Sequence, residues 1–156
     1  MRLIYFFFLI FALSSLCSCS KSEHPVPNRR FEVYFPLDRP EFQEEVFQVS
    51  RYYTGRQTSG SANSGAGVSG LIIYKQGYNQ YNAYDRYCPN DRNSSCIVSV
   101  NFDDPFYGVC NCCESEFLIS NPAAFPSGAP VLEGPAGHSL KQYRTRVENN
   151  YLIVWN

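Results

Sequence analysis

The sequence predicts an all-β fold, arranged as an antiparallel sandwich or a partly open barrel. No segment shows a sustained helical period, whereas short runs rich in Val, Ile, Tyr and Phe recur along the chain. Gly, Pro, Asn and Asp bound these runs, as expected for strands separated by turns. The 156 residues allow one domain with a leader. We therefore expect roughly six to nine short strands.

Residues 1–18 are predicted to be a secretion signal. Arg2 precedes a strongly apolar run that is too short to span a bilayer comfortably and ends in small residues. The stretch Leu16-Cys17-Ser18-Cys19 resembles a bacterial lipobox, with Cys19 as the lipidated residue and new N-terminus. Several acyl chains on Cys19 would hold the protein on a membrane surface. An uncleaved anchor and a plainly cleaved signal are the alternatives.

Residues 19–30 are predicted to be the lipidated N-terminus and a tether, because they are polar and contain Pro25 and Pro27, which favour an extended backbone. The β domain is expected over residues 31–156. Its strand-like segments are FEVYF (31–35), VFQVSRYY (46–53), VSGLIIYKQG (68–77), YNAYDRY (81–87), IVSVNF (97–102), EFLI (116–119) and YLIVWN (151–156).

The stretch LIIYKQGYNQYNAY is typical of a hairpin that turns near Gly77. Its alternating tyrosines are explained by core packing and cross-strand contacts, with an exposed binding face as the alternative. Residues 54–67 are rich in Gly and Ser and are expected to form a surface loop. They lack the lysine and the following helix of a phosphate loop. The Pro- and Gly-rich segment 122–137 is expected to be ordered by turns.

The net charge and the residue composition bear on which classes of function are expected. A net charge of −1 gives no electrostatic reason to expect nucleic acid as a partner. His24 and His138 are the two histidines, which leaves little material for imidazole chemistry. Neither a nucleophile–base pair nor a phosphate loop is evident, so an enzyme is the less favoured class.

Five of the seven cysteines lie close together after the leader. In an exported protein, disulfides are the default for close cysteines. Five is an odd number, however, and adjacent cysteines rarely pair with each other because the ring is strained. Metal binding is the alternative, since a C-x-x-C spacing lets two thiolates hold one ion. The five are Cys88, Cys96, Cys110, Cys112 and Cys113, of which Cys110 and Cys113 have this spacing.

Three separated motifs carry a resemblance to a known family: GLIIYKQGYNQYNAYDRYCP (70–89), CNCCESEF (110–117) and GAPVLEGPAGHSLKQYRTRVENNYLIV (128–154). Together they resemble Rieske-type [2Fe–2S] domains, in the divergent form found in lipoproteins of the Bacteroidetes. The resemblance implies a strand pair that feeds a Cys-Pro-x-His-type loop, and a second loop like Cys-Pro-Cys-His-Gly-Ser-x-Phe. It also implies a Gly-Pro-Ala turn close to the cluster, here residues 134–136. The cysteine-rich loops, residues 85–117, would form a small subdomain.

The sequence departs from this family at the iron ligands. In a Rieske centre two thiolates hold one iron and two imidazoles hold the other. Here the cysteine positions remain as Cys88 and Cys110, while the imidazole positions contain Asn90 and Cys113. A conventional Rieske cluster is therefore not expected. His138, which follows the Gly-Pro-Ala turn, is a weak candidate ligand, and its alternative is a surface loop histidine.

The resemblance also implies a disulfide between the two loops, for which Cys112 and Cys96 are the candidates. Three outcomes then remain open. The first is a metal-free domain with a further disulfide, Cys88–Cys110 or Cys88–Cys113. The second is a thiolate site for zinc, with Cys96, Asn90 or His138 as the fourth ligand. The third is an all-cysteine [2Fe–2S] cluster at Cys88, Cys96, Cys110 and Cys113.

The leader bears on this choice because it has no twin-arginine pair. The chain is then expected to cross the membrane unfolded, after which disulfides or zinc can form more readily than an iron–sulfur cluster. We expect a lipoprotein of the cell envelope, held at the outer membrane by its lipid anchor, that acts as a non-enzymatic interaction or structural module stapled by disulfides. A metal or iron–sulfur protein for electron transfer is the alternative.

Overall fold

The computed structural model describes residues 23–53, 55, 65–101 and 103–156, so the predicted lipidation site Cys19 lies outside the described residues. The described residues form two antiparallel sheets and a 3-10 turn at Pro40–Phe42, which confirms the all-β prediction. Within the described residues, no helix has the length and apolar character needed to cross a membrane.

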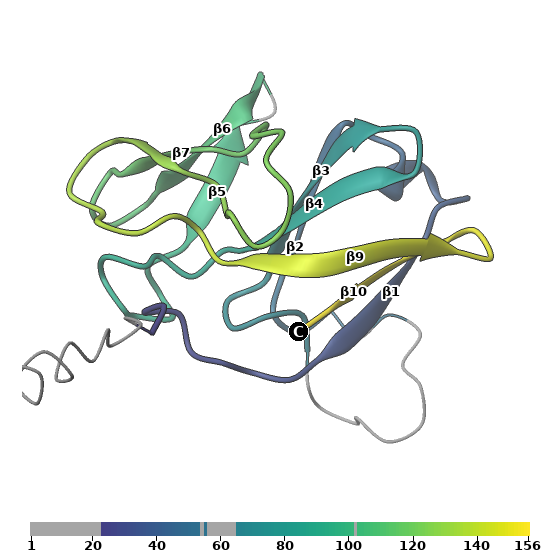
Figure 1. Cartoon of the computed structure of the whole chain (residues 1–156), viewed down its shortest axis with the longest axis horizontal. Coiled ribbons are helices and arrows are strands. Elements are labelled where there is room, and N and C mark those ends of the chain that lie inside the picture. Colours follow the sequence, from purple (N-terminus) through teal and green to yellow (C-terminus); the bar gives the residue numbers. More distant parts are fainter. Residues whose placement is uncertain (1–22, 54, 56–64, 102) are drawn as a thin grey trace, which may run out of the picture.

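The larger sheet has six strands and curls into a half-barrel (Figure 1). Its order is β1-β10-β9-β4-β3-β2, and every neighbouring pair is antiparallel. The strands are β1 (Glu32–Pro36), β2 (Val46–Val49), β3 (Leu71–Gly77), β4 (Gln80–Asp85), β9 (Gln142–Glu148) and β10 (Tyr151–Trp155).

The smaller sheet has four strands in the order β5-β6-β7-β8 and stands beside the half-barrel (Figure 1). Both cysteine-rich loops adjoin it: the first leads from β4 into β5, and the second joins β6 to β7. The cysteine-rich loops thus adjoin a second small sheet, which extends beyond the predicted range 85–117. Its strands are β5 (Val98–Asn101), β6 (Asp104–Cys110), β7 (Glu116–Leu118) and β8 (Val131–Glu133).

Seven strands overlap the segments predicted from composition, while β6, β8 and β9 were not among those segments. The predicted strand at 46–53 ends at Val49, because the chain turns there and the Tyr53 amide donates to the Ser50 carbonyl oxygen (3.0 Å). The hairpin prediction is confirmed. Strands β3 and β4 pair around Asn79, whose φ of 54° supplies the left-handed residue that tight hairpin turns favour.

Strands β3 and β4 are shared by two hydrophobic cores. Alternate residues of a strand point to opposite faces of its sheet. Leu71 and Ile73 accordingly pack in the core of the half-barrel, whereas Ile72 and Tyr84 pack in a second core that the smaller sheet also lines. Cys88 is part of this second core. The site described below therefore rests directly on the central hairpin.

The alternating tyrosines of this hairpin are packing residues. Tyr74, Tyr81, Tyr84 and Tyr87 are buried, and Tyr78, at the tip of the hairpin, is 91% exposed. The tyrosines thus form no continuous exposed face.

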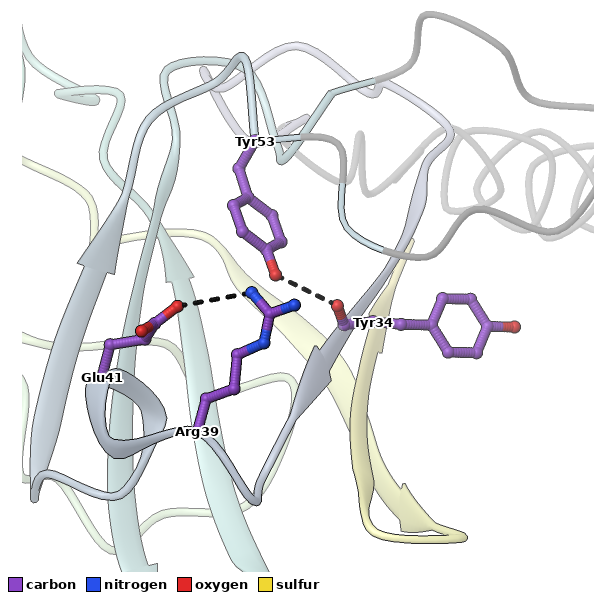
Figure 2. A network of polar contacts seen from close by, with 4 residues as sticks. All are labelled: Tyr34, Arg39, Glu41 and Tyr53. Atoms are coloured by element: carbon purple, nitrogen blue, oxygen red, sulfur yellow. Dashed lines mark hydrogen bonds and ion pairs between the residues drawn. The ribbon is translucent and has the colours of Figure 1, made fainter.

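A tyrosine also covers one end of the half-barrel core. The ring of Tyr53 stacks on Phe35 at 4.8 Å between centroids, and its hydroxyl donates to the carbonyl oxygen of Tyr34 (3.3 Å; Figure 2). The ion pair of Arg39 and Glu41 lies beside this contact (3.6 Å) but is exposed, so it contributes little to stability. The turn after β2 is thereby fixed against β1.

The segment expected to be a tether is partly folded onto the domain. His24 Nε2 donates to the Ser139 carbonyl oxygen (2.9 Å), and Val26 is 2% exposed. Lys141 Nζ donates to the carbonyl oxygen of Pro27 (3.3 Å). The described part of residues 19–30 therefore belongs to the β domain, because an apolar side chain and backbone acceptors find partners there.

Candidate metal centre

The first cysteine-rich loop is a compact turn that follows β4. The Cys88 amide donates to the Cys96 carbonyl oxygen (3.1 Å), and the Arg92 amide donates to the Cys88 carbonyl oxygen (3.3 Å). Arg92 has a φ of 50°, in the left-handed region that tight turns use. These bonds fold residues 88–92 back toward the smaller sheet.

A buried carboxylate fixes the start of this loop. Asp85, fully buried at the end of β4, accepts bonds from the backbone amides of Val68 (2.6 Å), Ser69 (3.2 Å) and Tyr87 (2.7 Å) and from the Tyr143 hydroxyl (2.7 Å). Burial raises the pKa of Asp85 even though these four donors favour the charged form. Asp85 thus ties the loop before β3, the start of the cysteine loop and strand β9 together.

The second cysteine-rich loop is a tight turn between β6 and β7. The Glu114 amide donates to the Cys110 carbonyl oxygen (3.1 Å), and the Cys110 amide donates to the Ser115 carbonyl oxygen (3.0 Å). This closure returns Cys113 to the side of Cys110. A disulfide between Cys96 and Cys112 joins the two loops, which is the pairing that the family resemblance implied.

Three thiols and one carboxylate converge between the loops. Cys88, Cys110 and Cys113 form no disulfide, and their sulfurs lie with an Asp91 carboxylate oxygen within 4.8 Å of one another. Two contacts within this group are close: the distance from Cys88 Sγ to Cys113 Sγ is 3.6 Å, and that from Cys110 Sγ to Asp91 Oδ2 is 3.3 Å. The cluster of Cys88, Asp91, Cys110 and Cys113 is called the thiol–carboxylate cluster below.

The further disulfide expected in the first outcome is absent from this described cluster, since neither Cys88–Cys110 nor Cys88–Cys113 is bonded. Cys96 is not available as a fourth ligand or to an all-cysteine cluster, because its sulfur is bonded to Cys112.

The two weak candidates differ in position. Asn90 contacts the thiol–carboxylate cluster, because its amide reaches the Asp91 carboxylate (3.5 Å), whereas His138 is not part of the cluster. His138 is exposed, with its ring 6.0 Å from that of His24. The turn before it faces the site, but His138 itself points to the N-terminal segment.

Asp91 is the site residue that the sequence analysis missed. It stands three positions after Cys88, just as Cys113 stands three positions after Cys110. The two loops therefore supply the same pattern, Cys-x-x-Asp and Cys-x-x-Cys. This repeated spacing is the sequence signal that points to Asp91.

The protonation states within the cluster follow from its burial. Burial raises the pKa of the Cys88 thiol and of the Cys110 thiol. Hydrogen bonds from the thiols of Cys113 and Cys88 lower the pKa of the Asp91 carboxyl. A metal ion that binds at the cluster replaces the protons of its thiol ligands.

The Gly-Pro-Ala turn packs against the second loop, as the resemblance implied. The Ser115 hydroxyl oxygen accepts bonds from the Cys113 thiol (3.2 Å) and from the Ala136 amide (3.0 Å). Gly134 has a φ of 93°, and a Cβ there would lie 2.6 Å from Ser115 Cα. Glycine is required at this position because the turn approaches the loop backbone so closely.

The residues present do not fit the cluster of a conventional Rieske centre. That cluster takes two imidazole ligands, and the corresponding positions hold Cys113, which is in the thiol–carboxylate cluster, and Asn90, whose amide contacts the Asp91 carboxylate (3.5 Å). The donors brought together here are three thiols and one carboxylate, with no imidazole among them. This donor set is one that a divalent metal ion accepts.

The fold and the site define a two-sheet β protein with disulfide-tied cysteine loops around a thiol–carboxylate cluster. Comparison with protein-family models, with curated proteins and with solved structures finds no match to this chain. The Rieske resemblance stays a prediction from the sequence motifs.

Proposed function

We propose that this chain is a lipid-anchored protein of a bacterial cell envelope, with a Rieske-like β domain that serves as a non-enzymatic structural or interaction module. The observation that carries the proposal is the Cys96–Cys112 disulfide, which ties the two loops together. Disulfides persist in exported proteins and are rare in the cytosol. The leader sequence and the lipobox-like stretch ending at Cys19 support the same compartment.

The anchor is tested by expressing the full chain in bacteria fed an alkyne-tagged palmitate. We expect label on the wild-type chain and its recovery with the outer membrane. Cys19→Ser should abolish the label, whereas the matched variant Cys17→Ser should keep it. Label that persists in Cys19→Ser, or a wild-type chain recovered without label, would contradict the proposal.

The thiol–carboxylate cluster favours a second candidate function, a metal–thiolate site that is structural or takes part in electron transfer. Three thiols that lie this close to one another and to a carboxylate are prone to oxidation in an oxidising compartment unless a bound ligand protects them. Elemental analysis of the chain purified from membranes without chelators should then show bound metal. The Cys88→Ser variant should lose it, and a wild-type chain without metal would contradict this candidate.

A further inference from the structure

We infer that Cys88, Asp91, Cys110 and Cys113 together bind one four-coordinate divalent ion, zinc, in place of a two-iron cluster. This inference rests on the metal–thiolate candidate function above and adds the number of ions, their class and the fourth ligand.

The resolved distances agree with a tetrahedral zinc site. Zinc bonds to sulfur at about 2.3 Å and to carboxylate oxygen at about 2.0–2.2 Å, so tetrahedral geometry separates two sulfurs by about 3.8 Å and a sulfur from an oxygen by about 3.6 Å. The Cys88–Cys113 sulfur pair is 3.6 Å apart, and the Cys110–Asp91 pair is 3.3 Å apart. Both edges need to expand by only a few tenths of an ångström.

The compactness of the cluster argues for one ion. All four donor atoms lie within 4.8 Å of one another. A two-iron cluster divides its protein ligands between two metals, so ligands of different irons stand farther apart than ligands of one ion.

The backbone of the second loop is arranged to stabilise a thiolate. At Cys110, the amide of Cys112 points to the sulfur (3.5 Å). Amide donors of this kind stabilise a sulfur that has lost its proton to a metal.

The binding step needs no oxidant. Three sulfur–hydrogen bonds break and three protons pass to solvent, while three zinc–sulfur bonds and one zinc–oxygen bond form. The Asp91 carboxylate, 3.3 Å from the Cys110 sulfur, supplies the oxygen of the zinc–oxygen bond. Zinc has no redox chemistry, so the oxidation states of the sulfurs and the metal stay unchanged.

The test uses the full chain, extracted from membranes in detergent, stripped of metal under reducing-agent-free conditions and titrated with Zn²⁺ and with Co²⁺. We expect one zinc per chain and, for Co²⁺, the intense visible absorption of tetrahedral cobalt with thiolate ligands. Asp91→Asn should weaken zinc binding by about tenfold or more and change the cobalt spectrum. The matched variant Glu114→Gln, a carboxylate of the same loop pair outside the cluster, should bind as wild type does.

Three results would overturn the inference. They also distinguish its failure from failure of the proposed metal–thiolate function. Two irons with acid-labile sulfide in the purified chain would leave the metal function standing but refute the single ion. Unchanged zinc affinity and cobalt spectrum in Asp91→Asn would remove Asp91 from the site. No binding of any metal would refute both together. The tryptophan fluorescence and urea midpoint of each metal-free variant show whether it is folded.

Discussion

Removal of the Cys96–Cys112 disulfide should destabilise the domain by about 3 kcal/mol. The bridge closes a loop with a sequence separation of 16, and the chain-entropy relation for a loop of that length gives about 3 kcal/mol at 25 °C. Replacing both cysteines by alanine removes the bridge, and Cys96 is already largely buried among apolar side chains, so alanine leaves no polar group without a partner.

The assay is urea unfolding of the metal-free chain, followed by the fluorescence of its one tryptophan, Trp155. Because β3 and β4 belong to both cores, we expect the two sheets to unfold together, and Trp155 in β10 then reports on the whole domain. With an m-value of about 1–3 kcal/mol/M, the midpoint should fall by about 1–3 M urea.

The wild-type chain reduced with dithiothreitol is the matched control, since it lacks the same bridge and has no substitution. It should lose the same stability as the Cys96→Ala/Cys112→Ala variant. A loss below about 1 kcal/mol in both would show that the two loops are already ordered in the unfolded ensemble, contrary to the loop-closure reasoning.

Three further predictions concern the surroundings of the site. Gly134→Ala should lower the free energy of unfolding, measured by thermal unfolding, by about 1–3 kcal/mol because of its positive φ alone, and by more because of the close contact with Ser115. The matched variant Gly137→Ala should change it little, and equal effects of the two variants would contradict the close-approach argument. Asp85→Asn should lower the free energy of unfolding in urea by about 1–3 kcal/mol, because the new side-chain NH2 group would face the buried donors that Asp85 now accepts from. The matched variant Asp38→Asn, at an exposed position, should change it by no more than about 0.5 kcal/mol. Burial lowers the pKa of His24, so its contribution to stability is full above about pH 6.5 and is lost as the pH falls through the lowered value. The protection factor of the Val26 amide against hydrogen exchange should fall in that acidic pH range. An unchanged protection factor would count against docking by the neutral imidazole.

The strands that could be predicted are those with continuous apolar or alternating side chains, such as β3, β4 and β10. Strand β6 could not, because Pro105 and Gly108 interrupt its pattern. In the structure Gly108 is where Val98 and Ile119 pack across the smaller sheet, since a Cβ there would lie 2.8 Å from a Val98 methyl group. The glycine that weakens the strand signal is thus required by tertiary packing.

The candidate site was predicted in part. The convergence of Cys88, Cys110 and Cys113 followed from the family resemblance, because it depends on two loops whose separation in sequence carries no signal of its own. Asp91 was missed, although the repeated three-residue spacing pointed to it. The position of His138 depends on how the turn at Gly134 packs against Ser115, and local sequence does not encode this tertiary contact.

The docked N-terminal segment has a consequence for how the domain meets a bilayer. His24 is held at Ser139, next to the turn that packs on the cysteine loops. If Cys19 carries the lipid, the four residue-to-residue steps from 19 to 23 reach at most about 14 Å. The domain would then have little rotational freedom and would present this edge to the headgroups.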